Sequence, residues 1–245
     1  MNWAVKWEKF VSSIEKSEYF QELLFKGLEN TVKVAVFGLI IGILIGTLIA
    51  VVKVAPKYKR SVRFLDKICS VYVAIFRGTP MTVQLLLAYY VLLPTLGVKN
   101  VDSLIVGIVV FGMNSGAYVS EIMRGGLNSV DIGQLEAGRA VGLSYGVSMV
   151  KIVIPQAIKN ILPTLGNEFI TLIKETSVLS FITVCDLYTA FSTIGSKNYE
   201  KMVPFLVMAV VYIVLVLLIT LLVRIIEKVL AKSDKSAPVL KKKKA

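Results

Sequence analysis

Glu168 and Glu175 are the residues whose type and spacing point most directly to chemistry. They lie in a largely apolar segment, and seven positions correspond to about 700° of helix, so both carboxylates fall on one face. Thr171 shares this face, whereas Asn167 and Lys174 fall on the neighbouring one. An ionisable side chain at membrane depth is costly unless it meets protein or water, so Glu168 is a candidate acceptor for the ammonium group or cationic side chain of a substrate.

Composition excludes most other chemistry. The sequence contains no histidine, so a Ser-His-Asp triad, a Cys-His dyad or a histidine-ligated metal cannot be built from this chain alone. Its two cysteines, Cys69 and Cys185, form no Cys-x-x-Cys pair, and no GxxxxGK[ST] nucleotide loop is present. We expect no catalytic residue, no metal site and no cofactor in this chain, and any work driven by ATP requires a partner.

The overall composition indicates a membrane protein. Of 245 residues, 56% are hydrophobic and 18% are charged, against about 25% charged in soluble domains. The mean hydropathy is +0.73, yet the net charge is +12. Three explanations for the positive excess compete: nucleic-acid binding, anionic ligands, and the cytoplasmic loops of a membrane protein.

The apolar segments predict an all-α polytopic membrane protein with five transmembrane helices. The first segment has nineteen uncharged residues, which cover about 28 Å as a helix. The second is interrupted at Arg77-Gly78-Thr79-Pro80, which indicates a broken helix. The fourth carries the polar residues described above. The predicted spans are about 34–52, 68–97, 104–122, 161–184 and 202–223.

The basic residues predict the orientation of these spans. Eighteen of the 28 lie between spans one and two, between spans three and four, or after span five. The positive-inside rule therefore places the N-terminus outside and the C-terminus in the cytoplasm, and an odd number of spans gives the same answer. The net charge of +12 is therefore explained by the orientation of the chain in the membrane more than by binding of an anionic ligand.

Three regions follow from this pattern. Residues 1–29 form an amphipathic N-terminal segment, with Trp3, Trp7, Phe10 and Ile14 on one helical stripe. This helix lies on the outer membrane surface or packs on the rest of the protein. Residues 30–225 form the transmembrane domain, and residues 226–245 form a basic cytoplasmic tail that anchors to anionic lipid.

The connection between spans three and four, residues 124–160, is long for an idle loop. Its first part favours a short helix that ends at Gly142, and Ser144 is a plausible N-cap for a second helix that would run to Pro155. Two short helices with few charges indicate a surface for docking another protein.

This loop resembles the EAA loop of the membrane subunits of ATP-binding-cassette importers. That pattern is E-A-A, three residues, G, nine residues, then I-x-L-P; here Gly138 replaces the second alanine and Ile154 the leucine. The resemblance implies a cytoplasmic coupling helix that inserts into a partner ATPase. A side chain at Gly142, which would form the turn between the two short helices, is expected to weaken that coupling. The coupling residues that it implies are Glu136, Ala137, Gly138, Gly142, Leu143, Ile152 and Pro155.

Further motifs resemble the polar amino-acid branch of these permeases. They are Phe76-Arg77-Gly78-Thr79-Pro80 with Gln84, Asn114-Ser115-Gly116-Ala117-Tyr118 with Glu121, and Lys174-Glu175-Thr176-Ser177. The resemblance implies a permease subunit in the bacterial plasma (inner) membrane that imports a polar or cationic amino acid by alternating access. It implies a second permease subunit of the same or a sister chain, a cytoplasmic ATPase dimer that holds ATP and Mg, and an extracytoplasmic amino-acid-binding protein.

Within the spans, two sets of polar residues have different expected roles. The substrate pathway is expected to include Glu168, Asn167, Thr171, Asn114, Thr79 and Gln84. Structural ion pairs are expected at Lys174, Glu175, Arg77 and Glu121. An alternative for Glu168 is a structural pair with Lys174 or Arg77.

Two other classes of protein remain as alternatives. An ion-gradient-driven secondary transporter usually shows inverted repeats and broken helices in matching halves, and this sequence shows no such symmetry. A membrane enzyme or an assembly scaffold is weakened by the absence of histidine, although composition permits a Ser/Lys pair. Transport or catalysis without ATP would favour one of these alternatives.

Overall fold

The computed structural model of the chain describes residues 2–234, with side chains as far as residue 229, and this part consists of helices and their connections, with no strand. Lys235 and the lysines at 241–244 of the predicted tail lie outside the described residues. In chain order the segments are α1 (Trp3–Glu15), α2 (Glu18–Val54), α3 (Arg60–Gly78), α4 (Met81–Leu86), η1 (Leu87–Leu92), α5 (Leu93–Thr95), α6 (Ser103–Asn128), α7 (Ile132–Ala140), α8 (Tyr145–Ser148), η2 (Met149–Val153), α9 (Ile154–Glu175), η3 (Thr176–Ile182), α10 (Leu187–Lys197) and α11 (Met202–Asp234).

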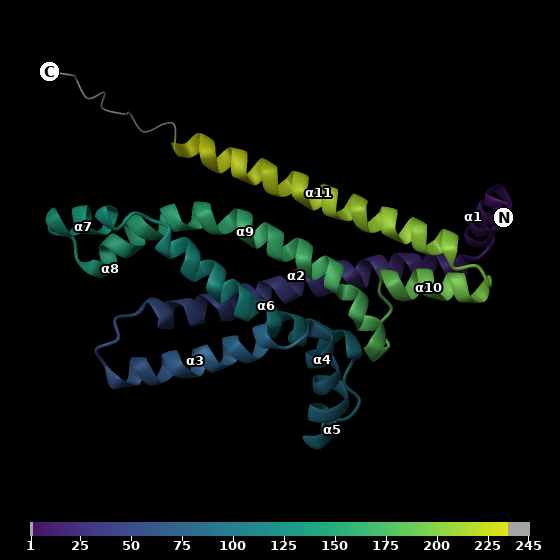
Figure 1. The fold of residues 1–245 in the computed structure, drawn as a ribbon, viewed down its shortest axis with the longest axis horizontal. Coiled ribbons are helices and arrows are strands. Elements are labelled where there is room, and N and C mark those ends of the chain that lie inside the picture. The colour runs from purple at the N-terminus through teal and green to yellow at the C-terminus, as the bar shows by residue number, and fades with distance from the viewer. Residues whose placement is uncertain (1, 235–245) are drawn as a thin grey trace.

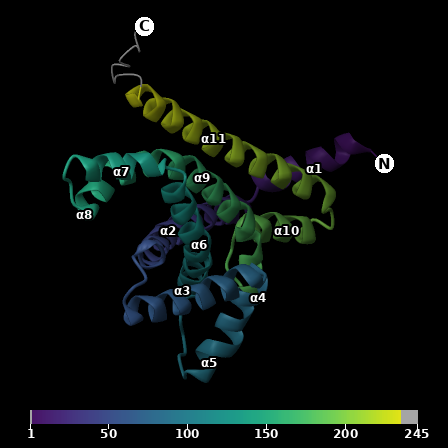
Figure 2. The ribbon, with the colours of Figure 1, turned by 60° about the vertical axis from the view of Figure 1, so that its left-hand side comes forward.

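The long helices α2, α6, α9 and α11 run along the same axis of the molecule (Figure 1). Helices α7 and α8 gather at one end together with the connection between α2 and α3, and the second view shows the same grouping (Figure 2). Helix α1 and the connection between α10 and α11 lie at the opposite end. The loop between spans three and four therefore projects from one end of a helical bundle.

Within the described residues, three helices are long and apolar enough to cross a membrane: α2, α6 and the part of α11 up to Val229. Two bent pairs also qualify, and counting each as one span gives the predicted five. The first pair, Arg60–Gly78 with Met81–Thr95, bends by 107° where Thr79 and Pro80 interrupt the helix. The second, Tyr145–Ile182 with Leu187–Lys197, bends by 56°. The predicted all-α membrane fold is confirmed.

Glycines allow α2 and α6 to pack closely. Gly38, Gly42 and Gly46 recur once per turn on α2, and a Cβ at Gly46 would lie 2.6 Å from Val119 Cγ1 and 2.8 Å from the backbone nitrogen of Ser120. Gly112 and Gly116 of α6 face α2 in return. Small residues at such a contact let two backbones approach within a membrane, where no hydrophobic effect drives helices together.

This contact makes Gly46→Ala a strong test of the α2–α6 packing. Val119 is fully buried and the other close atom is the backbone nitrogen of Ser120, so neither can move away easily from an added Cβ. Overpacking of this kind costs about 1–3 kcal/mol, so we expect a lower thermal unfolding midpoint in detergent. Gly125→Ala on α6 is the matched control, because a Cβ there meets nothing within 4 Å. Equal unfolding midpoints for the two variants would contradict the packing described.

The second bend is held by buried polar groups rather than by apolar packing alone. Fully buried Asp186 caps α10 by accepting hydrogen bonds from Thr189 N at 2.9 Å and Thr189 Oγ1 at 2.6 Å. From α2, Asn30 Nδ2 donates to Cys185 O at 2.8 Å, and Thr31 Oγ1 accepts from Leu187 N at 3.2 Å. Irregular backbone at membrane depth is tolerated because protein groups satisfy it in this way.

One sequence-based boundary is wrong. The helix after Gly142 does not end at Pro155 but continues through η2 and α9 to Glu175. Proline lacks a backbone N–H and its ring clashes with the preceding turn, but the wider π-helical turn at Met149–Val153 lies just before it. The loop therefore passes directly into the fourth span.

Helix α1 packs on the rest of the chain and also exposes two tryptophans. Phe10 is buried against residues of α10 and α11, whereas Trp3 and Trp7 are exposed. Lys9 Nζ donates to Asn198 O at 2.9 Å, and Lys6 Nζ lies 2.5 Å from Glu200 Oε2. Of the two expectations for this segment, packing on the protein is confirmed; the position of the exposed tryptophans at a membrane surface stays a prediction.

The contact between Lys6 and Glu200 makes the attachment of α1 depend on pH. Hydrogen bonding from Lys6 holds the pKa of the Glu200 carboxyl below its ordinary value. Its stabilising effect is therefore complete above the ordinary carboxyl pKa and is lost as the pH falls through the lowered one. We expect Glu200→Gln to speed amide hydrogen exchange in α1 at neutral pH, and the difference from wild type to vanish in acid.

The matched control for this experiment is Glu8→Gln. Glu8 is exposed on α1 and makes no ion pair within residues 2–234. Its substitution leaves exchange unchanged. Identical exchange in all three proteins at neutral pH would contradict the role given to Glu200.

Candidate functional site

The loop between spans three and four is built as two short helices joined by a left-handed glycine. Asp131 caps α7 by accepting a hydrogen bond from Gly133 N at 2.7 Å. At the other end Gly142 adopts φ +88°, Gly142 N donates to Arg139 O at 3.0 Å and Leu143 N donates to Gly138 O at 3.1 Å. These two bonds form a Schellman motif, which ends α7 and reverses the chain toward α8.

Gly138 holds the two arms of the loop together. It is buried, and a Cβ there would lie 2.8 Å from Ile152 Cδ1 and 2.9 Å from Ser148 Oγ. The glycine found here in place of the alanine of the EAA pattern thus lies at a tight contact between α7 and the following helix. Gln156 Nε2 also donates to Gln134 Oε1 at 3.2 Å, so a hydrogen bond joins the two arms of the loop in addition to this packing.

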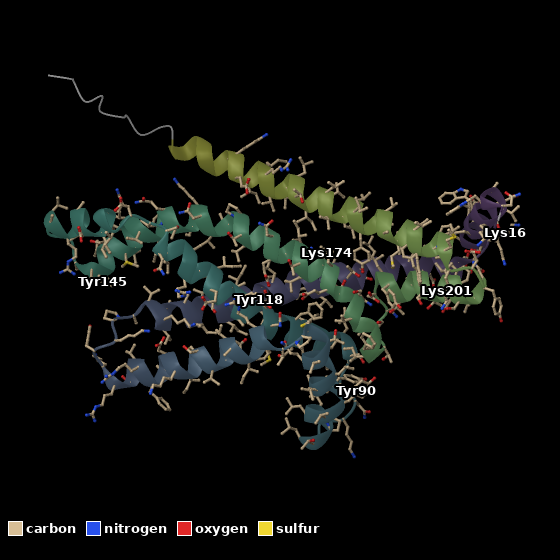
Figure 3. The ribbon with its side chains drawn as sticks, viewed as in Figure 1. Lys16, Tyr90, Tyr118, Tyr145, Lys174 and Lys201 are labelled. Carbon is tan, nitrogen blue, oxygen red and sulfur yellow. The ribbon has the colours of Figure 1, made fainter. Side chains whose placement is uncertain are left out.

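The outer surface of this unit combines charged and apolar side chains. Glu136, Ala137 and Arg139 are exposed on α7. Ile132 is 68% exposed and Val141 is 78% exposed, and Leu143 lies beside the turn. Figure 3 places Tyr145 at this same end of the molecule. Apolar side chains exposed together with a charged one are typical of a protein docking surface.

Within the bundle, Glu168 of α9 meets α6. Its Oε1 accepts a hydrogen bond from Ser115 Oγ at 2.9 Å, and Ser115 itself is fully buried. Glu168 is partly buried, and the neighbouring Asn167 and Thr171 are exposed. A carboxylate held by one hydroxyl retains the capacity to accept further hydrogen bonds from an ammonium group.

A second polar group forms at the break between α3 and α4. Gln84 Nε2 donates to Phe76 O at 2.8 Å and to Thr79 O at 3.0 Å, which satisfies carbonyls left free at the end of α3. Gln84 Oε1 accepts in turn from Asn114 Nδ2 at 2.8 Å. Three residues of the expected pathway, Thr79, Gln84 and Asn114, thus form one network that fixes the broken helix against α6.

Further along α6, three polar residues follow at intervals of about one turn: Tyr118, Glu121 and Arg124. The guanidinium of Arg77 lies 5.4 Å from the centre of the Tyr118 ring, a cation–π contact. Glu121 pairs with Lys53 of α2 at 2.9 Å and with Arg124 at 2.6 Å. A hollow of about 460 Å³ beside these residues is lined by Arg77, Tyr118 and Glu121 together with residues of α9.

Of the four residues expected to form ion pairs, only Glu121 does so within the described part of the chain. Glu121 has two cationic partners, whereas Arg77 contacts a ring instead of a carboxylate. In the described part of the chain Lys174 and Glu175 form no ion pair, and Glu168 pairs with neither Lys174 nor Arg77. The hydrogen-bond partner of Glu168 is Ser115. Sequence reasoning missed Ser115 as a functional candidate because a small residue in a glycine-rich helix indicates close packing first. A group of metal-ligating residues is likewise absent from residues 2–234.

Fold and site together define a multi-pass membrane protein in which a two-helix loop projects from one end and polar residues of three spans meet inside. The family of binding-protein-dependent transport system inner membrane components has a model that matches residues 38–232. The chain belongs to this family, as the EAA-like loop suggested.

Individual relatives agree over most of the chain. A protein of Rickettsia bellii named as a glutamine transport system permease is 39% identical over 215 residues, which are 87% of this chain and 96% of that protein. The arginine transport system permease protein of Bacillus subtilis is 36% identical over 211 residues, 86% of this chain and 94% of that one.

A solved structure extends the comparison to the fold. It is a crystal structure of an amino acid ABC transporter with histidines, with a TM-score of 0.80 and 37% identity over 89% of this chain and 97% of that chain. An inward-facing methionine ABC transporter shares the fold at 21% identity and a TM-score of 0.67.

Proposed function

We propose that this chain is the permease subunit of an ATP-binding-cassette importer that moves a polar or cationic amino acid inward. The observation that carries the proposal is the loop of α7, Gly142 and α8, a pair of short helices that projects from the bundle and is continuous with the fourth span (Figure 1). Family membership and relatives named for glutamine and arginine transport support the substrate class.

The loop is the proposed contact with the partner ATPase. Exposed Glu136 accepts hydrogen bonds from a basic residue or backbone N–H groups of the partner, and the apolar residues around it fill a cleft there. Because η2 joins the loop to α9 without a break, a movement of the loop is transmitted along the helix that carries Glu168. ATP and Mg are held by the partner, and this chain hydrolyses nothing. The proposed coupling residues are Glu136, Ala137, Gly138, Gly142, Leu143, Ile152 and Pro155.

Glu168 is the proposed contact for the cationic group of the substrate. The bond to Ser115 orients its carboxylate, and the exposed Asn167 and Thr171 offer further polar contacts on the same helix. Thr79, Gln84 and Asn114 complete the proposed path, with their mutual hydrogen bonds fixing the broken second span. Binding of a substrate ammonium group to a partly buried carboxylate gives a charge-assisted hydrogen bond, which is stronger than a hydrogen bond between neutral groups.

The proposed assembly contains two permease subunits, a cytoplasmic ATPase dimer and an extracytoplasmic amino-acid-binding protein. The proposed location is the bacterial inner membrane, with the N-terminus outside and with α7, α8 and the C-terminus in the cytoplasm. Residues 1–29, 30–225 and 226–245 then serve as outer segment, permease domain and inner tail. ATP-driven closure of the ATPases draws the two loops together, and the spans alternate between outward and inward openings.

Co-purification in mild detergent tests this assembly. We expect the tagged permease to retain a stoichiometric ATPase whose turnover rises when a substrate-loaded binding protein is added. Cationic, neutral polar and acidic amino acids, each offered on its binding protein, then test the substrate class. Isolation of the permease without an ATPase, or an ATPase indifferent to every binding protein, would contradict the proposal.

A further inference from the structure

An apolar groove of about 510 Å³ lies beside the loop end of the bundle. Its walls come from the end of α2, the second half of α6 and the start of α9, and α8 closes one end. Val51 and Val54 line it from α2, Met149 from the loop and Ile158 from α9. Its volume is that of a small-molecule site, but its surface is almost wholly apolar and offers nothing to orient a polar ligand.

The groove faces away from the polar hollow of the candidate path. The hollow is lined from α6 by Tyr118 and Glu121, and the groove by Met123 and Leu127. At 100° per residue these two sets lie about half a turn apart on α6. On α2 the groove continues into an outward face of Leu44, Leu48 and Val51, each more than 60% exposed. We take this exposed apolar face of the span to be the one that lipid covers.

Basic residues begin where the groove ends. Pro56 lines its rim, and the segment that follows contains Lys57, Lys59, Arg60 and Arg63 with no acidic residue before Asp66. Lys57 is bound to Asp66 at 2.7 Å. Lys59 and Arg60 are exposed and make no ion pair among the described residues. Three residues span at most about 11 Å, so the Lys59 backbone is within that distance of the rim.

We propose that this groove binds an anionic phospholipid, with an acyl chain in the groove and the phosphate held by Lys59 and Arg60. The apolar lining selects a hydrocarbon chain, and the basic rim selects a negative headgroup. A lipid bound here contacts both the end of α2 and, at Tyr145 and Met149, the loop proposed to meet the ATPase. The composition of the adjacent leaflet would thereby influence loop position. The site requires only that α2, α6 and α9 lie in a membrane, so it goes beyond the transport function.

Native mass spectrometry of the purified permease–ATPase complex tests the site. The complex is exchanged into detergent containing equal phosphatidylglycerol and phosphatidylcholine, and the lipids retained are counted. We expect wild type to retain phosphatidylglycerol in preference to phosphatidylcholine. The double substitution Val51→Trp, Ile158→Trp fills the groove and abolishes this retention, whereas Leu44→Trp, on the same lipid face outside the groove, preserves it.

A charge series tests the headgroup contact. Each basic residue beside an anionic lipid contributes enough that losing two weakens binding by roughly 30-fold. We therefore expect Lys59→Gln with Arg60→Gln to remove the preference for phosphatidylglycerol. The matched control, Arg224→Gln with Lys228→Gln on α11, leaves it intact. Equal retention of both lipids by wild type, or unchanged retention by the groove-filled variant, would overturn the proposal. So would a helix of a second subunit occupying the groove in a cryo-EM map of the complex in nanodiscs.

Discussion

Replacement of Gly142 by valine is expected to reduce transport on the order of 10- to 100-fold while the protein still inserts into the membrane. Gly142 adopts φ +88°, a left-handed conformation that costs a residue with a Cβ about 1–3 kcal/mol, and most for a β-branched one. A Cβ at this position meets nothing within 4 Å, so the penalty comes from backbone conformation and not from a clash. The strain opposes the turn that sets α8 beside α7, and the loop leaves its docking geometry.

Two matched variants separate this mechanism from a general loss of structure. Gly142→Asn is expected to retain more transport, because asparagine tolerates the left-handed region better than valine. Gly146→Val places the same side chain four residues later, in α8, where a Cβ also meets nothing within 4 Å and φ is negative, and we expect transport close to wild type. Uptake into proteoliposomes, normalised to inserted protein, is the measurement. Equal uptake by Gly142→Val and Gly146→Val would refute the coupling role of the turn.

Replacement of Glu168 by glutamine is expected to weaken transport of a cationic amino acid on the order of 10- to 100-fold. The substitution keeps the size of the side chain and an oxygen that can accept from Ser115 Oγ, but it removes the charge. Hydrogen bonds to charged groups contribute about 1.5–3 kcal/mol, which corresponds to this range. The interaction that is lost is the one with the positive charge of the substrate. Uptake of a neutral polar amino acid is therefore affected less, and the ratio of the two uptake rates changes.

Glu175→Gln is the matched control for Glu168→Gln. Glu175 lies two turns further along the same helix and is also partly buried, but it makes no hydrogen bond to α6 within the described residues. We expect it to leave substrate preference unchanged. Ser115→Ala, which preserves the close packing against Gly42, is expected to give an intermediate loss, since it removes only the orientation of Glu168. If Glu168→Gln leaves both uptake and preference unchanged, the binding role is wrong.

The helical architecture could be predicted from the sequence because its signals are local. An uncharged run in α2, a glycine with an N-cap serine after it, and a proline directly after Thr79 each act on their own segment. The failure at Pro155 has the opposite origin. A proline usually ends a helix, but a π-helical turn at Met149–Val153 precedes it here, and neither composition nor periodicity reveals such a turn.

Helical periodicity placed Glu168 and Glu175 on one face of a helix, and the family resemblance placed the break residues together with Gln84, which hydrogen-bonds Thr79 O. The roles of these residues in a substrate path stay predictions. Periodicity could not identify Ser115 as the partner of Glu168, because that contact joins α6 to α9, two helices far apart in the chain. In the same way, Arg77 could be expected to seek a carboxylate, yet the fold places the Tyr118 ring beside it. Contacts between segments far apart in the chain require the packed structure.

Uptake by proteoliposomes distinguishes an ATP-driven importer from a transporter driven by an ion gradient. The permease is reconstituted with its ATPase, the binding protein and radiolabelled amino acid are supplied on one side, and ATP with Mg on the other. We expect uptake that requires ATP and the binding protein together, is indifferent to ion gradients, and is strongly reduced by Gly142→Val. Uptake driven by an ion gradient in the absence of ATP would contradict it and would make the chain a secondary transporter.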